Sequence, residues 1–309
     1  METAAYHLFR TFGRGIRFLI ALATLAVVMT TAGCRQDRGT WEEEEAGTGT
    51  RYRLWFREPA TMWEAALPLG NGHLGMMPDG HLREETIVLN DITLWSGGVQ
   101  DADNPEAAEH LPEIRRLLFE GRNDLAQELV YNTFRCKGAG SGHGNGTKVP
   151  YGSYELLGHL RLHYEGDTAA DPMDYHRALS LDDAMATTRY TLGETGYRRD
   201  YFVSFSDDVG LIRLTAGRKG MVNVRISLDR PEKFTTTAAG SRLEMTGQVE
   251  NGTDGKGMRY RTLVSVKTKK GKVTTYGNSL VVSGATEALI YVSAGTDYKN
   301  PGFEKAVEE

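Results

Sequence analysis

Residues 151 to 300 alternate between apolar and polar side chains, and this period of two constrains the fold more than any other feature. In "MVNVRISLD" (221–229) the apolar face consists of Val222, Val224, Ile226 and Leu228. In "GMRYRTLVSVKTKKGKV" (257–273) the corresponding face consists of Tyr260, Thr262, Val264 and Val266. Such alternation is typical of strands with one buried and one solvated face. Because turn residues bound each segment, the sequence predicts an all-β dominated fold, a large antiparallel β-sandwich.

A helical segment interrupts this pattern. "DNPEAAEHLPEIRRLLFEG" (103–121) offers Asn104 as an N-cap, Pro105 at the first helical position and Gly121 as the end. Asn123 then offers a second cap before apolar residues at helical spacing. We therefore expect a short inserted pair of helices.

Three glycines in "PLGNGHLGMMPDG" (68–80) match the spacing of the dinucleotide-binding fingerprint, namely Gly70, Gly72 and Gly75. That fingerprint needs a helix after the last glycine, and Pro78 and Gly80 would break one. We therefore exclude a nucleotide site. The segment predicts a strand, a Pro-Asp-Gly turn over 78–80 and a returning strand through 87–89, with Asp91 at a turn or strand end.

The first 34 residues have the pattern of an export signal: a positive region, then an apolar stretch too short to span a bilayer. "TAGC" ends this stretch at Cys34, which predicts a lipid-anchored, membrane-bound lipoprotein in the periplasm or on the cell surface. An ordinary secretory peptide is the alternative. Residues 35–50 are polar and predict a flexible tether, in which Glu42–Glu45 form either an acidic export tag or a solvated run.

Charge and cysteine content narrow the function classes. The chain has 41 acidic against 36 basic residues, and its eight histidines lack zinc-finger spacing, so nucleic acid is an unexpected partner. If Cys34 carries lipid, Cys136 is the remaining thiol and the mature chain forms no internal disulfide. No residue pattern indicates a cofactor or a metal site.

The segment "LPLGNGHLGMMPDGHLREETIVLNDITLWSGG" (67–98) resembles the opening signature of glycoside hydrolase family 95, whose best-known members are α-L-fucosidases. The resemblance continues in "YGSYELLGHLRLHY" (151–164), although His159 stands where the family commonly carries Asp. It covers about residues 51–300, which we expect to form the family's N-terminal β-sandwich.

The resemblance implies an enzyme built from this sandwich, a helical linker, a large α/α-barrel and a C-terminal β-domain. Hydrolysis of α-L-fucosides would be inverting, with a Glu general acid and an Asp general base in the barrel. Residues 301–309 resemble the start of the linker, so we expect no catalytic residue here and no activity from this chain alone. The implied partners of the full-length enzyme are a fucosylated glycan and that barrel. Two alternatives are a stand-alone carbohydrate-binding lipoprotein and a module that docks on a separately encoded barrel.

A few residues are candidates for the rim of a sugar pocket or for the interface with the barrel. They are Gly70, Asn71, Gly72 and His73 in the glycine-rich loop, together with Trp95. The other tryptophans, Trp41, Trp55 and Trp63, are expected to pack in the interior or at interfaces.

Other polar residues are expected to be structural. Glu84 and Glu85 are adjacent, so on a strand they point to opposite faces and cannot form an acid–base pair. Each of these carboxylates, like Asp91 and Glu155, is expected to be solvated. His159 and His163 share one strand face but lack a third ligand nearby, so we expect an exposed pair.

Overall fold

The computed structural model describes residues 52–98, 103–136, 152–165, 171–252 and 254–308. The predicted export signal with Cys34 and the predicted tether lie outside these residues. Within these ranges, no helix has the length and apolar character needed to cross a membrane.

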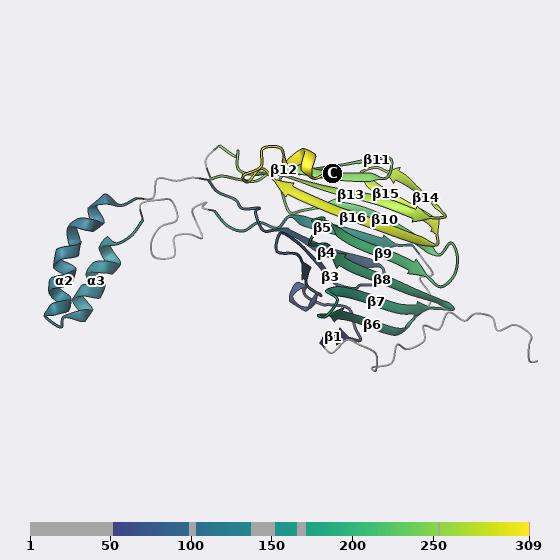
Figure 1. The fold of residues 1–309 in the computed structure, drawn as a ribbon, viewed down its shortest axis with the longest axis horizontal. Helices are drawn as coiled ribbons and strands as arrows, with labels where there is room; N and C mark the ends of the chain where they lie inside the picture. Colours follow the sequence, from purple (N-terminus) through teal and green to yellow (C-terminus); the bar gives the residue numbers. More distant parts are fainter. Residues whose placement is uncertain (1–51, 99–102, 137–151, 166–170, 253, 309) are drawn as a thin grey trace, which may run out of the picture. The chain divides into compact units, whose positions relative to one another are not determined.

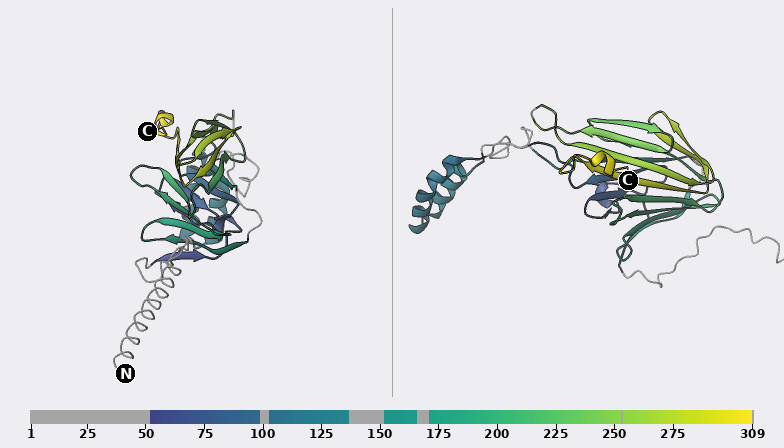
Figure 2. Two further views of the ribbon diagram at one scale, coloured as in Figure 1. Left: turned by 90° about the vertical axis from the view of Figure 1, so that its right-hand side faces the viewer. Right: turned by 45° about the horizontal axis from the view of Figure 1, so that its top comes forward.

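Two antiparallel sheets lie face to face and enclose one apolar core (Figures 1 and 2), which confirms the predicted β-sandwich. The nine-stranded sheet has the order β1 (Arg53–Phe56), β6 (Pro172–Ser180), β7 (Met185–Leu192), β8 (Thr195–Val203), β9 (Gly210–Ala216), β16 (Glu287–Thr296), β13 (Arg259–Lys269), β12 (Arg242–Gln248) and β11 (Phe234–Ala239). The seven-stranded sheet has the order β14 (Lys272–Tyr276), β15 (Ser279–Ala285), β10 (Val222–Asp229), β5 (Gly158–Tyr164), β4 (Glu84–Asp91), β3 (Leu74–Pro78) and β2 (Leu69–Gly70).

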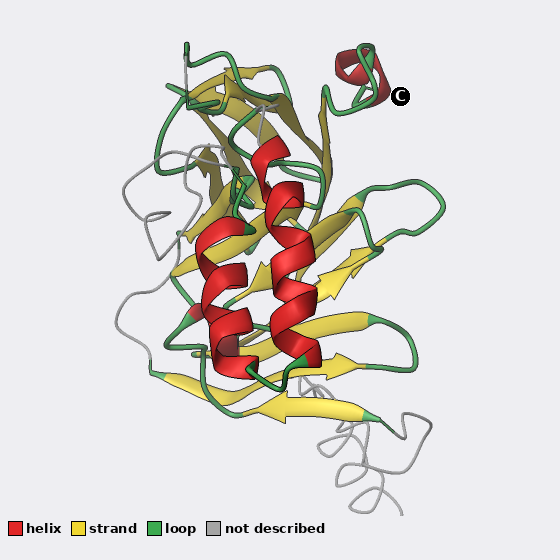
Figure 3. Ribbon diagram, turned by 90° about the vertical axis from the view of Figure 1, so that its left-hand side faces the viewer, coloured by secondary structure: helices red, strands yellow, loops and turns green. Residues whose placement is uncertain are grey.

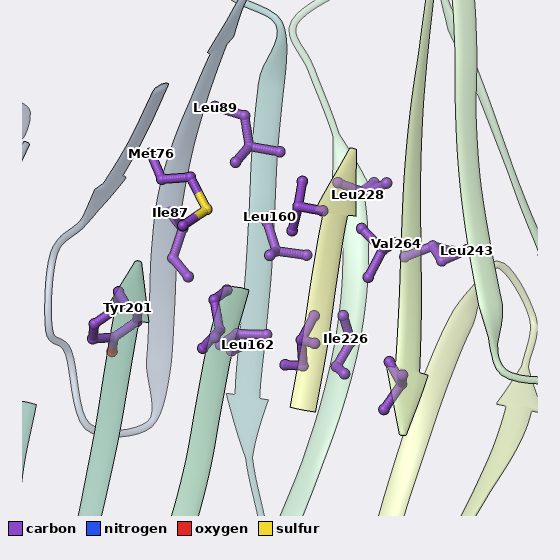
Figure 4. Close-up of a cluster of buried hydrophobic side chains, with 14 of the residues drawn as sticks. Met76, Ile87, Leu89, Leu160, Leu162, Tyr201, Ile226, Leu228, Leu243 and Val264 are labelled. Atoms are coloured by element: carbon purple, nitrogen blue, oxygen red, sulfur yellow. The ribbon is translucent and has the colours of Figure 1, made fainter. Parts of the chain in front are cut away.

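The core follows from the alternation in the sequence. Along β10 every second side chain is buried, and Ile226 pairs with Leu162 of β5 in the same buried row. Residues from the facing sheet, among them Val264 and Tyr201, complete the layer (Figure 4). Burial of such side chains contributes roughly 1.5–3 kcal/mol each relative to exposure.

The glycine-rich segment folds as predicted, into strand β3, a turn and strand β4. No helix follows Gly75, because this residue lies within β3. Gly80 closes the turn with φ +75°, and a Cβ there would lie 2.5 Å from the Tyr175 hydroxyl. The turn therefore requires glycine for both its backbone angle and its close packing.

The predicted helices form as a 3-10 turn η2 (Pro105–His110), helix α2 (Leu111–Phe119) and helix α3 (Asn123–Thr133). The two helices contact each other side by side (Figure 3). Both capping predictions were wrong in detail, because Asn123 is the first residue of α3, after the N-cap Arg122, and the Asn104 side chain makes no cap bond. Its amide instead donates to the carbonyls of Thr133 and Arg135, which ties the entry of the helical segment to its exit.

Two short helices complete the described elements. The 3-10 turn η1 (Trp63–Ala65) precedes β2, and helix α4 (Phe303–Ala306) follows β16. Phe303 and Val307 are buried, and the Ser293 hydroxyl of β16 donates to the Val307 carbonyl at 2.7 Å. The start of the predicted linker segment therefore packs on the sandwich.

The expectation that the carboxylates on strand β4 are solvated was wrong for two of them. Glu85 and Asp91 are fully buried rather than solvated, because strand alternation places both on the core side of β4. Glu84 points to the opposite, exposed face, as predicted. Trp55 and Trp63 are half or more exposed, so they do not lie in the interior of the sandwich, and packing at an interface stays a prediction for both.

Candidate functional site at the strand ends

Three connections meet at one end of the sandwich, where we define the strand-end surface. It consists of the β2–β3 loop (71–73), the segment after β4 (92–98) and the β8–β9 loop (204–209), with Tyr154 and Thr296 beside them. Side-chain contacts join the β2–β3 loop to the β8–β9 loop and the segment after β4 to the end of β16. Because the loops are anchored by strands of both sheets, this is where the sandwich can present functional groups with defined geometry.

Asn71 organises the loop between β2 and β3. Its side-chain oxygen accepts the backbone N–H groups of His73 (2.9 Å) and Leu74 (2.8 Å). Its amide donates to the Ser204 carbonyl (2.9 Å) and to Asp208 Oδ1 (2.7 Å). One asparagine thus fixes its own loop and ties that loop to the β8–β9 loop.

His73 lies between two carboxylates. Its Nδ1 is 2.6 Å from Asp208 Oδ2, and its Nε2 is 3.5 Å from Asp91 Oδ1. The His73 side chain is about one-third exposed (37%), whereas Asp91 is completely buried. The two carboxylates fix the orientation of the imidazole, and Asp91 beneath it cannot reach a substrate directly because it is fully buried.

Asp91 links the loop to the other sheet. Its Oδ1 accepts the Thr93 N–H (2.8 Å) and the Thr93 hydroxyl (2.6 Å), and that hydroxyl lies 2.6 Å from the Thr296 hydroxyl at the end of β16. Its Oδ2 is buried and has no hydrogen-bond partner among the described residues. A buried carboxylate oxygen without a hydrogen bond costs free energy of folding, so packing alone does not explain an aspartate at this position.

Trp95 and Tyr154 form an aromatic pair at the rim. They face each other across an isolated β-bridge, with ring centroids 5.6 Å apart and an interplanar angle of 69°. The indole N–H donates to the Ile92 carbonyl, which orients the ring. Burial raises the pKa of the Tyr154 hydroxyl, and the nearby negative charge of Asp91 raises it further.

Large apolar side chains surround this polar cluster. Those that are about half exposed or more are Ile92, Trp95, Tyr154, Phe205 and Tyr298. Phe205, at the tip of the β8–β9 loop, is 85% exposed. A polar centre with an apolar, partly aromatic rim is typical of a surface that another domain or a sugar covers.

The structure brings together Asn71, His73 and, at the rim, Trp95, three of the predicted site residues. Gly72 lies in the loop with φ +93°, which permits its turn, whereas Gly70 belongs to β2 and takes no part in the polar contacts. Sequence reasoning missed Asp208, Thr93 and Tyr154. Asp208 lies 135 residues from its imidazole partner, so no local pattern could reveal it.

Other predicted positions have structural roles. His159 contacts Asp229 and His163 contacts Glu84, so the two histidines are paired with carboxylates on the outer sheet face. In the part of the chain that the structure describes, no group of three or more His, Cys, Asp or Glu residues could hold a metal ion. Cys136 is exposed.

The sequence of residues 54–301 matches the family model described as "Glycosyl hydrolase family 65, N-terminal domain". The chain belongs to this family. Proteins similar to this chain carry names that agree with the predicted resemblance to fucosidases. "Alpha-L-fucosidase 2" of Arabidopsis thaliana is 26% identical over 271 residues, which are 81% of this chain and 31% of the plant protein.

Two similar fungal proteins also carry fucosidase names. "Probable alpha-fucosidase A" of Aspergillus niger is 27% identical over 265 residues, covering 80% of this chain and 30% of the fungal protein. The Aspergillus oryzae protein of the same name is 26% identical, covering 81% of this chain and 34% of its own. The chain therefore spans about a third of the length of the curated relatives it matches. Among solved structures, "Putative kojibiose phosphorylase from human microbiome" aligns with a TM-score of 0.46 and 11% identity, over 84% of this chain and 34% of that one.

These matches confirm that the family domain is related to glycoside hydrolases and to fucosidases in particular. The family model carries the number 65, whereas the sequence resemblance was to family 95. Both describe an N-terminal domain, and its matched range of 54–301 agrees with the expected sandwich of 51–300.

Proposed function

We propose that this chain is the non-catalytic N-terminal β-sandwich of an exported, lipid-anchored, α-L-fucosidase-like glycoside hydrolase. In the full-length enzyme, inverting hydrolysis of fucosylated glycans takes place in a helical barrel, and the strand-end surface contacts that barrel. The observation that carries the proposal is the match to a glycosyl hydrolase N-terminal domain, together with matches to three proteins named as fucosidases that each cover about a third of the relative's length.

The strand-end surface supports the second part of the proposal. Its apolar rim, with Phe205 85% exposed and Trp95 48% exposed, is the kind of surface that a domain interface covers. The Asn71 and His73 cluster beneath holds the loop in one conformation. Such preorganisation lowers the conformational cost of binding a second domain.

The first test is to read the coding sequence beyond codon 309 and to assay this chain with an aryl α-L-fucoside. Barrel-coding sequence downstream, together with no hydrolysis by the chain alone, supports the proposal. Hydrolysis above a buffer control by the pure chain contradicts it. Incorporation of labelled fatty acid, and its loss in Cys34→Ala, tests the anchor.

A stand-alone carbohydrate-binding lipoprotein is the second candidate, and the half-exposed Trp95–Tyr154 pair favours it. Aromatic faces bind sugar rings without any need for a catalytic domain. Calorimetry with fucosylated oligosaccharides separates the candidates. Binding by the wild type that Trp95→Ala abolishes, combined with a stop codon and unrelated sequence downstream, would favour this second function.

A further inference from the structure

A row of basic side chains crosses the outer face of the nine-stranded sheet at β6, β7 and β8. His176 of β6 lies directly opposite Arg189 of β7, and Arg189 lies directly opposite Arg198 of β8. Directly opposite side chains have Cβ atoms roughly 4.5–5.5 Å apart, and like charges in this relationship destabilise a sheet. Arg189 and Arg198 are such a like-charged pair, so their repulsion destabilises the free protein, and His176 adds to this repulsion when it is protonated.

Compensation of these charges is incomplete. Asp200 neutralises Arg198 at 2.8 Å, but in the described part of the chain no carboxylate lies within ion-pair distance of Arg189, Arg53 or Arg57. Burial lowers the pKa of His176, and the positive charges of Arg189, Arg53 and Arg57 lower it further. The whole chain has a net charge of −5, so this positive field is a local property of one face.

An exposed aromatic ring lies beside the row. Trp55 of edge strand β1 is 50% exposed and stacks on the His176 ring, with centroids 6.0 Å apart and planes 14° from parallel. Arg57 lies over the same indole, 5.7 Å from its centroid. Strand β1 pairs with β6 at the edge of the nine-stranded sheet (Figure 1). The register of this pairing places Trp55 opposite Ala178, next to the basic row.

We propose that the outer face of β1, β6 and β7 binds an anionic polysaccharide through Trp55, His176, Arg189 and Arg57. Guanidinium groups bind carboxylate or sulfate oxygens through paired hydrogen bonds, and the indole contacts the flat face of a sugar ring. Binding of an anion removes the repulsion that the free protein carries. This site is separate from the strand-end surface and does not depend on the proposed hydrolase role.

The size and context of the row indicate a sugar chain. Strand spacing of about 4.8 Å places β1 and β7 roughly 10 Å apart, a span that a single sugar residue does not cover. Nucleic acid would also meet a basic face, but the chain belongs to a glycosyl hydrolase domain family and is acidic overall. We therefore assign the ligand to polysaccharides that carry sulfate or carboxylate groups.

Affinity electrophoresis and calorimetry on the full chain test this proposal with dextran sulfate, polygalacturonate, neutral dextran and a DNA duplex. We expect binding to one or both anionic polysaccharides, weakening with salt, and none to neutral dextran. The two anionic probes separate sulfate from carboxylate recognition. Binding to neither, or equal binding to DNA, overturns the proposal.

Variants locate the site. Arg189→Gln should weaken binding about tenfold, the effect of losing one charge-assisted contact. Trp55→Ala should also weaken binding, because it removes the indole face on which a sugar ring packs. Arg225→Gln, the same change of charge on the outer face of β10 in the other sheet, should leave binding unchanged. Weaker polysaccharide binding by Arg189→Gln but not by Arg225→Gln supports the site. Equal loss of binding in the two variants contradicts it. Arg189→Gln should also melt no lower than wild type, because it relieves repulsion, so weaker binding cannot reflect unfolding.

Discussion

The guanidinium of Arg199 in β8 lies 3.0 Å from the carboxylate of Glu85 in β4, so a buried ion pair joins the two sheets. Tyr201 and Tyr164 donate to the same carboxylate at 2.5 and 2.8 Å. Arg199 also donates to the carbonyls of His81 and Leu82. Burial of these charges is tolerated because neighbouring groups bind both Glu85 oxygens and both terminal nitrogens of Arg199.

Glu85→Gln should lower the free energy of unfolding by about 3–5 kcal/mol, because it leaves the Arg199 charge buried without its partner. Glu84→Gln, on the exposed side of the same strand, should cost less than about 1 kcal/mol. Guanidinium denaturation of both variants measures the difference. Equal costs would show that the cross-sheet pair contributes little to stability.

Asn71→Ala should lower the free energy of unfolding by about 2 kcal/mol, since it removes four hydrogen bonds that hold two loops together. The loop around His73 should exchange its amide hydrogens faster. Hydrogen exchange on the variant tests this directly. If the amide hydrogens of this loop exchange at the same rate in the variant and in the wild type, Asn71 does not fix the strand-end surface.

The pKa of His176 is lowered in the folded state, so its protonation is less favourable there than in the unfolded chain. The unfolded chain therefore binds the proton more readily than the folded protein. As the pH falls below the ordinary histidine pKa of about 6.5 and through the lowered pKa of the folded state, His176 lowers the free energy of unfolding. His176→Gln should therefore lose less stability than wild type between pH 7.5 and about pH 5. Denaturation midpoints across that range provide the measurement, and parallel pH profiles would argue against the effect.

Gly80→Ala should destabilise the sandwich by about 1–3 kcal/mol, because alanine there has a strained φ and meets the Tyr175 hydroxyl at 2.5 Å. Gly193→Ala is the matched control, since its φ is also positive but no atom lies within 4 Å of the added Cβ. It should show the backbone cost alone, about 1 kcal/mol. The difference between the two melting curves isolates the steric contribution.

The strands could be predicted from the sequence because burial in a two-layer sheet follows local alternation. The four apolar residues of 222–228 are buried at every second position, as expected. The turn at Gly80 was also visible, since its backbone requirement is local. Asn71, His73 and Trp95 were identified as one candidate region, and the structure places them at one end of the sandwich.

The remaining features depend on contacts between distant segments. Glu85 looked like a surface carboxylate because its partner Arg199 lies 114 residues away in the other sheet. Asp208 joins His73 across a similar separation, and neither residue has a local signature. The sequence left open whether Trp55 packs in the interior or at an interface, and the order of strands decides against the interior, because it puts β1 at a sheet edge where the ring stays exposed.

Strands β4 and β5 pair directly, although the segment between them contains the whole helical hairpin. The pairing of Leu89 with Gly158 closes this excursion at its base, so the sheet owes none of its register to the helices. The hairpin is therefore an insertion between two strands that pair with each other, and we expect the sandwich to tolerate its replacement. Replacing residues 103–136 with a Gly-Ser linker should leave the denaturation midpoint of the sandwich unchanged.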